Sequence, residues 1–258
     1  RQRRDRRCRP DCGASLLRLE VVGDDPVGDI GPEHTALHAR VAEVHAADDP
    51  GQFDLRLADR HQVALSVSAG LGLTGAVHMF GAEEVAVRCV TEPDLVDAYL
   101  EVDHRYNLGI MRIALELGVD IVKRNGFYES CDLFSPAVLG RFLSDRLRRE
   151  AALVHTGGAL FGYTLLSGWV PILDWLATLG IDSLFCPDVF LRGGDARLLA
   201  GTLGATTSFW TGPSDTIHMP YERPDEVRRA VRHVFDVFGT TGLILTPCSS
   251  AKAVFPWE

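Results

Sequence analysis

The sequence predicts an α/β protein with a largely parallel sheet, because strand-like and helix-like segments alternate. Between residues 119 and 250 a short apolar stretch is followed by an amphipathic stretch about five times. Such alternation is typical of parallel strands with covering helices. An open doubly wound sheet and a (β/α)8 barrel both fit it. The chain shows neither a dinucleotide-binding glycine fingerprint nor a phosphate-binding P-loop, which weakens the nucleotide-binding open sheet.

Composition narrows the class of protein and its partners. The 258 residues are 46% hydrophobic and 24% charged, enough for one large α/β domain or two small ones. The net charge of -9 disfavours a nucleic-acid partner. The six scattered cysteines are typical of reduced thiols, so we expect a cytoplasmic protein. No clean apolar span of ~20 residues is evident, so we expect no membrane partner.

The N-terminal segment differs from the rest of the chain. It begins "RQRRDRRCRPDC", with six arginines in the first nine residues and no apolar region after them. We expect residues 1–27 to be a basic segment that is disordered or truncated. Residues 28–258 are then the folded domain.

The pattern of apolar residues, glycines and prolines predicts the elements. We expect a strand within 60–70, a loop or short turn at 75–81, and a helix over 91–118 with Thr91 as its cap. A strand over 119–126 and a helix over 135–151, capped by Ser135, follow. The apolar run 152–154 is interpreted as a further strand that ends at His155. Later helices are expected at 168–180, 194–204 and 223–239, and later strands within 181–188, 205–215 and 241–250.

Polar residues recur where the predicted strands end, which is where α/β proteins of either architecture place their function. These candidate residues are Tyr128, Glu129, Asp132, His155, Asp188, Ser214, Asp215 and Cys248. Each also has a structural interpretation. Asp132 and Asp195 could cap the following helices, and a cysteine at a strand end often serves as an apolar filler. Arg124 is expected to form a strand-edge ion pair.

His155 and Cys248 together suggest a metal site. Zinc takes nitrogen and thiolate ligands, and a catalytic zinc needs about three protein ligands plus an open position. Glu129 or Asp215 would supply the third ligand.

Four stretches also resemble a known family. They are "LELGVDIVKRNGFYESCDLFSPAVLGRFLSDRLRR" (115–149), "LVHTGG" (153–158), "LATLGIDSLFCPD" (176–188) and the segment 210–258 that ends in "FPWE". In order and spacing they resemble the uroporphyrinogen decarboxylase superfamily, over about residues 28–258. The resemblance implies a (β/α)8 barrel, truncated at both ends, because related chains are longer. A fragment, or a barrel completed by a partner chain, is expected, and a homodimer is left open.

Within that superfamily the chain looks nearer to the zinc-dependent corrinoid methyltransferases. His155 matches their zinc-binding histidine and Cys248 their later cysteine, whereas Gly157 stands where they have a middle cysteine. The resemblance implies methyl transfer between a corrinoid carried by a partner protein and a small acceptor, either a thiol activated by zinc or a folate. Zinc coordination would deprotonate such a thiol.

The resemblance assigns roles to the candidate residues. Asp132 and Asp215 are expected to be catalytic. Tyr128, Asp188 and Ser214 are expected to bind substrate. His155, Cys248 and Glu129 are expected to bind zinc. Two alternatives remain: a metal-free carboxy-lyase like uroporphyrinogen decarboxylase, and a non-catalytic member that binds a corrinoid or another partner.

Overall fold

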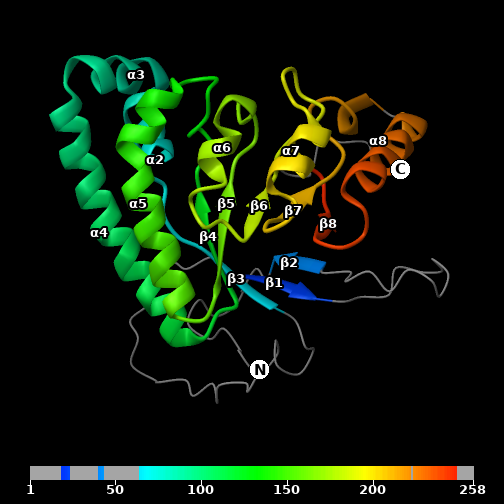
Figure 1. Cartoon of the computed structure of the whole chain (residues 1–258), viewed down its shortest axis with the longest axis horizontal. Coiled ribbons are helices and arrows are strands. Elements are labelled where there is room, and N and C mark those ends of the chain that lie inside the picture. The colour runs from blue at the N-terminus through cyan, green and yellow to red at the C-terminus, as the bar shows by residue number, and fades with distance from the viewer. Residues whose placement is uncertain (1–18, 24–39, 44–63, 222, 249–258) are drawn as a thin grey trace.

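The computed structural model describes residues 19–23, 40–43, 64–221 and 223–248. The predicted basic segment and its boundary at residue 27 lie largely outside this range. The described strands form one eight-stranded sheet (Figure 1). They are β1 (Leu19–Gly23), β2 (Arg40–Glu43), β3 (Ala64–Ser68), β4 (Ile121–Asn125), β5 (Leu160–Thr164), β6 (Ser183–Phe185), β7 (Ser208–Thr211) and β8 (Leu243–Leu245).

The helices follow the parallel strands in the alternation that the sequence predicts. They are α2 (Leu73–Phe80), α3 (Ala82–Thr91), α4 (Pro93–Leu117), α5 (Pro136–Thr156), α6 (Leu173–Leu176), α7 (Ala196–Leu203) and α8 (Pro224–Phe238), with two 3-10 turns at Val170–Ile172 and Met219–Tyr221. The long helices α4 and α5 lie side by side at one end of the molecule (Figure 1).

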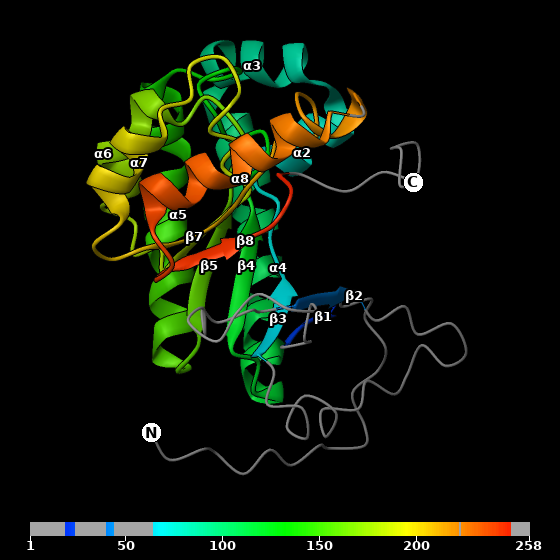
Figure 2. The same cartoon turned by 90° about the vertical axis from the view of Figure 1, so that its right-hand side faces the viewer.

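The sheet of the described residues is open rather than closed, which is consistent with the expected truncated barrel and not with a full (β/α)8 barrel. The strand order is β2-β1-β3-β4-β5-β6-β7-β8. Strands β3 to β8 pair in parallel, whereas β1 pairs antiparallel with both β3 and β2. In the described part of the chain, six parallel strands therefore curl into a partial barrel, with β2 and β8 at the edges (Figures 1 and 2).

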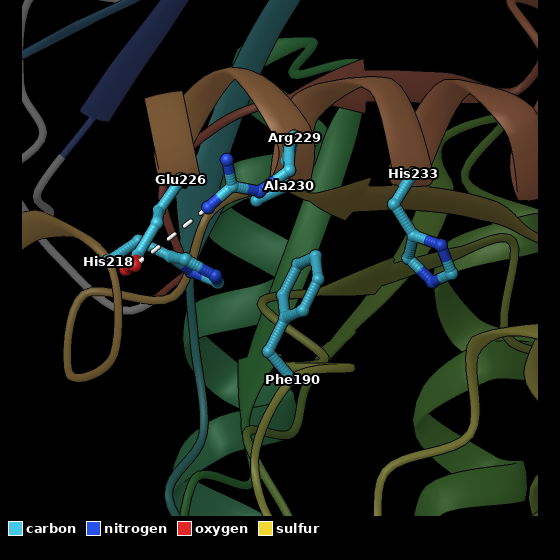
Figure 3. Close-up of a pocket in the computed structure, with 6 residues that line it drawn as sticks. All are labelled: Phe190, His218, Glu226, Arg229, Ala230 and His233. Atoms are coloured by element: carbon cyan, nitrogen blue, oxygen red, sulfur yellow. Dashed lines mark ion pairs between the residues drawn. The ribbon is translucent and has the colours of Figure 1, made fainter. Parts of the chain in front are cut away.

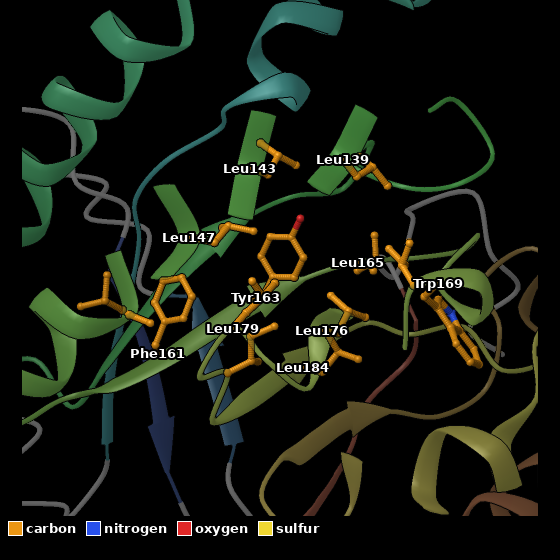
Figure 4. Packing of buried hydrophobic residues seen from close by; sticks show 14 of the residues in the cluster. Leu139, Leu143, Leu147, Phe161, Tyr163, Leu165, Trp169, Leu176, Leu179 and Leu184 are labelled. Carbon is orange, nitrogen blue, oxygen red and sulfur yellow. The ribbon is translucent and has the colours of Figure 1, made fainter. Parts of the chain in front are cut away.

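Alternate residues of the parallel strands point to opposite faces of the sheet. On one face, the paired side chains of Val122 and Phe161 belong to the main hydrophobic core. Figure 4 shows Phe161 and Tyr163 beside leucines of α5 such as Leu147. On the opposite face a smaller cluster forms, in which the rings of Phe185 and Trp210 lie 4.4 Å apart. Helices therefore cover one face and leave the carboxyl ends of the strands at a common edge.

Several element boundaries agree with the sequence pattern. Pro93 begins α4, and Gly118 ends it in the left-handed conformation with φ 79°. Ser135 caps α5, and its side chain accepts a hydrogen bond from the Val138 amide. Asp195 caps α7 in the same way. Thr91 was wrongly expected to cap α4, because its hydroxyl instead donates to the Val87 carbonyl at the end of α3.

Two predicted elements are wrong. Residues 75–81 were expected to form a loop but belong mostly to helix α2, which is bracketed by Gly72 and Gly81 at positive φ. The run 152–154 was expected to be a strand, but it forms the last turns of α5, which continues to Thr156. The real strand, β5, begins only at Leu160, after Gly157 and Gly158.

A buried network of charged side chains joins four of these elements near the carboxyl edge. Arg124 of β4 donates to Glu150 of α5 at 2.8 and 3.0 Å, and to Glu129 at 2.8 Å. This is the ion pair that the sequence predicts for Arg124. The Tyr163 hydroxyl of β5 donates to the second oxygen of Glu129 at 2.6 Å, and the Leu73 amide of α2 donates to the first at 2.8 Å.

The network is closely packed. Gly72 has φ 52°, and a Cβ at this position would overlap the guanidinium of Arg124 and the carboxylate of Glu129. Burial raises the pKa of Glu129, and the charge of Arg124 opposes that shift. Burial, with the nearby charge of Glu129, also raises the pKa of Tyr163. The phenol therefore stays protonated, and its hydroxyl donates a hydrogen bond to Glu129.

The hydrogen bond from Tyr163 to Glu129 is expected to contribute to stability. Tyr163→Phe removes the only hydrogen-bond donor to Glu129 Oε2 in the described network. The free energy of unfolding should therefore fall by about 1–3 kcal/mol. Urea unfolding followed by circular dichroism measures this. The matched control is Tyr106→Phe, because Tyr106 is 67% exposed on α4. Equal unfolding midpoints for the two variants would contradict the prediction.

Candidate functional site

The carboxyl edge of the sheet carries a cavity of about 490 Å³ between α2 and the loops after β4 and β5. We call it the Tyr128 cavity. Its described lining consists of Val77, His78, Ala82, Phe127, Tyr128, Ser130, Asp132, Leu133, Leu166 and Ser167. The volume lies in the range of small-molecule sites. Two predicted site residues, Tyr128 and Asp132, thus lie in the wall of one cavity.

The polar groups of the Tyr128 cavity are held by local hydrogen bonds. Asp132 is exposed, and its carboxylate accepts a hydrogen bond from the Ser167 hydroxyl at 2.6 Å. The Tyr128 amide donates to the Thr74 hydroxyl of α2 at 3.0 Å. Asp132 therefore joins the β4 loop to the β5 loop. Ser135 rather than Asp132 caps α5, so the capping interpretation of Asp132 is wrong.

Glu129 belongs to the same loop as Tyr128 and Asp132 but points the other way. Its side chain is fully buried and makes the contacts to Arg124, Tyr163 and Leu73 described above. These contacts occupy both of its oxygens, so Glu129 acts in the structure as an anchor of α2 and β5.

A second group of predicted residues lies at the carboxyl ends of β6, β7 and β8. We call Asp188, Ser214, Asp215 and Cys248, together with His218, the Cys248 cluster. Ser214 and Cys248 form a parallel β-bridge, and the Ser214 amide donates to Nδ1 of His218 at 3.0 Å. Asp215 is almost buried and accepts from the Thr216 hydroxyl. The Cys248 cluster therefore brings together four of the predicted site residues: Asp188, Ser214, Asp215 and Cys248.

Cys248 is a buried, protonated thiol. Its side chain is fully buried, and Sγ lies near the carbonyl oxygens of Gly212 and Pro187. Burial raises the pKa of this thiol to about 12. Because a thiolate is the nucleophilic form, Cys248 in this state is a poor nucleophile.

Asp188 is also buried, with a carboxylate that is only partly satisfied. Its Oδ1 accepts from the Phe190 amide at 3.0 Å, whereas Oδ2 has no hydrogen-bond partner among the described residues. Burial raises the pKa of Asp188. The Asp188 amide donates to the Leu166 carbonyl at 2.8 Å, so the Cys248 cluster adjoins the wall of the Tyr128 cavity.

Two histidines near these sites were not among the residues predicted from the sequence. His78 lines the Tyr128 cavity from α2, a segment that was expected to be a loop. His218 lies four residues after Ser214, and burial lowers its pKa, which favours the neutral imidazole. It also lines a shallow pocket of about 310 Å³ with Phe190, Glu226, Arg229, Ala230 and His233. Figure 3 shows Phe190 between the two histidines, beneath α8.

His155 lies at the opposite edge of the sheet from Cys248. It is in the last turn of α5, ahead of β5, and its Nε2 pairs with Oδ2 of Asp182 at 2.7 Å, ahead of β6. Both residues therefore mark the amino ends of strands. The expectation that His155 follows a strand and faces Cys248 is wrong, because residues 152–156 are helical.

The predicted zinc ligands consequently do not come together. The carboxyl end of β5 continues with Leu165, Leu166 and Ser167, which offer neither imidazole nor thiolate. Glu129 is engaged in the buried network. Within residues 64–221 and 223–248, no three histidine, cysteine, aspartate or glutamate side chains are grouped so that they could hold a metal ion. The described residues therefore do not fit a zinc site.

Comparisons with solved structures support the fold. A methyltransferase from Methanosarcina mazei superposes with a TM-score of 0.65 at 17% identity, covering 78% of this chain and 58% of that one. At this identity the likeness shows the fold alone. A dihydropteroate synthase from Yersinia pestis with a sulfonamide drug gives a TM-score of 0.37 at 12% identity, covering 57% of this chain and 53% of that one, which is too low to support an argument.

The sequence comparisons add no family. No protein-family model matches the chain, and no curated protein matches it. The chain spans 58% of the length of the methyltransferase that it resembles in fold. Among the described helices, none combines the length and apolar character needed to span a bilayer.

From the position of His155 we predict that its side chain does not contribute to zinc binding. His155→Ala should leave the zinc content of the purified protein unchanged, because His155 and Cys248 lie at opposite edges of the sheet. Elemental analysis of the variant and the unaltered protein, both reconstituted with zinc, measures this. Loss of about one zinc per chain in the variant would mean that His155 is a ligand after all.

The state of Cys248 predicts slow alkylation. With its pKa raised from 9.0 to about 12, the thiolate fraction at neutral pH is about a thousandfold smaller than for an ordinary cysteine, and burial adds to the effect. Iodoacetamide should therefore modify Cys248 in the unfolded protein but hardly in the native one. Peptide mass spectrometry distinguishes its rate from those of the other cysteines. Rapid native labelling of Cys248 would contradict the assignment.

Proposed function

We propose that this chain is a methyltransferase that exchanges a methyl group between a corrinoid on a partner protein and a small molecule in the Tyr128 cavity. One observation carries the proposal: a cavity of small-molecule size lies at the carboxyl edge of a fold similar to that of a methyltransferase. Barrel-type enzymes place their active sites at this edge. The corrinoid partner follows from the family resemblance.

The residues of the cavity suit a binding and orienting role. Leu133 and Leu166 form apolar walls that would exclude water from the reacting methyl group. Asp132, held by Ser167, supplies a carboxylate in the same wall. A small molecule between these walls would be oriented toward the open carboxyl edge, where the corrinoid of a partner protein can approach.

The proposal includes no zinc step, because the described residues do not fit a zinc site. Cys248 is assigned a structural part in the cluster at β6 to β8, because no group of three candidate metal ligands includes it among the described residues and its protonated thiol is a poor nucleophile. An acceptor thiol would therefore need another source of activation. A methyl donor whose leaving group needs no activation therefore suits this site better than a thiol acceptor.

A carboxy-lyase acting on pyrrole carboxylates is less well supported. Such a substrate carries several negative charges and calls for arginine or lysine side chains in the site. No arginine or lysine is among the described residues that line the Tyr128 cavity. Arg124 is buried and paired with Glu129 and Glu150, so it is not available to bind a substrate.

Filling the Tyr128 cavity with a larger side chain should slow methyl transfer strongly. The assay follows the loss of methylcobalamin absorbance without oxygen, with free methylcobalamin in place of the partner-bound corrinoid and with thiols and tertiary amines as acceptors. Leu166→Trp should slow transfer by about a hundredfold, the scale expected for a displaced substrate.

The matched control is Leu198→Trp, because Leu198 is 45% exposed on α7. It should retain the rate of the unaltered protein. If no acceptor is methylated in a protein-dependent way, or if Leu166→Trp is as active as the control, the proposed function is wrong.

A further inference from the structure

Three rings line the Tyr128 cavity. The ring of Tyr128 makes an edge contact with Phe127, and another with His78 of α2, each with centroids 5.2 Å apart. Because Tyr128 and Phe127 are half-buried, parts of their surfaces remain available to a ligand. The faces of such rings carry partial negative charge and attract cations.

The charged side chains around the cavity also favour the binding of a cation. Asp132 is exposed at the wall, and no lysine or arginine is among the described lining residues. Glu83, which directly follows the wall residue Ala82, is exposed in the first turn of α3. The whole chain carries a net charge of -9, which also favours the approach of cations.

We propose that the Tyr128 cavity binds a quaternary ammonium cation that carries N-methyl groups, one of which is the group transferred. This inference rests on the proposed function and names its substrate class. Aromatic rings beside a carboxylate recognise a quaternary ammonium group, because its charge is spread over methyl groups that need no hydrogen-bond partners. The apolar walls contact those methyl groups, and Asp132 balances the charge.

The reaction balances without a further reactant. The electron pair of a cob(I) corrinoid on the partner protein forms the new cobalt–carbon bond. The carbon–nitrogen bond breaks, and its electron pair remains on nitrogen. Cobalt is thereby oxidised from Co(I) to methyl-Co(III), and the positive nitrogen becomes a neutral tertiary amine. No proton is taken up or released.

This balance agrees with the chemistry of the site. Zinc is useful to a methyltransferase when a thiol must lose its proton before it reacts. A quaternary ammonium donor has no such proton, and its leaving group departs as a neutral molecule. A cavity whose described lining offers a carboxylate and rings but no set of zinc ligands therefore fits this substrate.

The test compares a cation with its neutral isostere. Calorimetric titration of the full chain uses choline, tetramethylammonium and 3,3-dimethylbutan-1-ol, in which carbon replaces the nitrogen of choline. Choline should bind at least about tenfold more tightly than the alcohol, as expected for a cation that contacts aromatic rings and a carboxylate. Tyr128→Leu and Asp132→Asn should each weaken choline binding several-fold and change alcohol binding little.

The matched control is Tyr106→Leu, which removes an exposed tyrosine of α4 and should bind choline as the unaltered protein does. Circular dichroism verifies that each variant is folded. Equal affinity for choline and the alcohol, or no binding of either cation at millimolar concentration, would overturn the inference.

The inference and the proposed function fail separately. Methyl transfer from methylcobalamin to thiols without selective choline binding would contradict only the substrate class. Selective choline binding without methyl transfer to any acceptor would support the cation site and contradict the methyltransferase function.

Discussion

The geometry of the candidate site depends on the buried carboxylate of Glu129. It receives hydrogen bonds from Arg124 of β4, Tyr163 of β5 and the amide of Leu73 at the start of α2. A buried carboxylate is costly unless it is paired, and Arg124 supplies the compensating charge. The adjacent residues in the chain are Tyr128 and Ser130, which line the cavity. The anchor that joins three elements therefore also fixes the direction of the cavity wall.

Much of the fold could be predicted because its boundaries have local causes. Ser135 with Pro136 begins a helix through capping, and Gly118 ends one because glycine readily adopts positive φ. The turn from α5 to β5 could not be predicted in the same way. The run 152–154 is apolar whether it ends a helix or forms a strand, and such short runs are ambiguous by periodicity alone. In the structure Val154 belongs to α5 and is buried in the main core.

In the candidate site, too, the features with a local cause could be predicted and the others could not. Tyr128 and Asp132 could be predicted to lie together, because one short loop after β4 carries both. The opposite orientation of Glu129 in that loop depends on Arg124 and Tyr163, and no local pattern indicates it. His78 was missed because Gly75 and Gly81 suggested a loop, whereas burial of Leu73 and Ala76 stabilises a helix there. The error at His155 followed from the misplaced strand, since it moved the residue to the wrong edge of the sheet.

The two halves of the carboxyl edge differ in chemistry, and the difference bears on the direction of methyl transfer. Around Cys248, burial favours neutral forms: the thiol stays protonated, His218 tends to lose its proton, and the pKa of Asp188 is raised. Such surroundings do not generate a thiolate. Around Tyr128 the carboxylate of Asp132 is exposed and the rings are accessible, which stabilises a positive charge. A substrate that arrives charged and leaves neutral would be bound by the second half without any activation by the first.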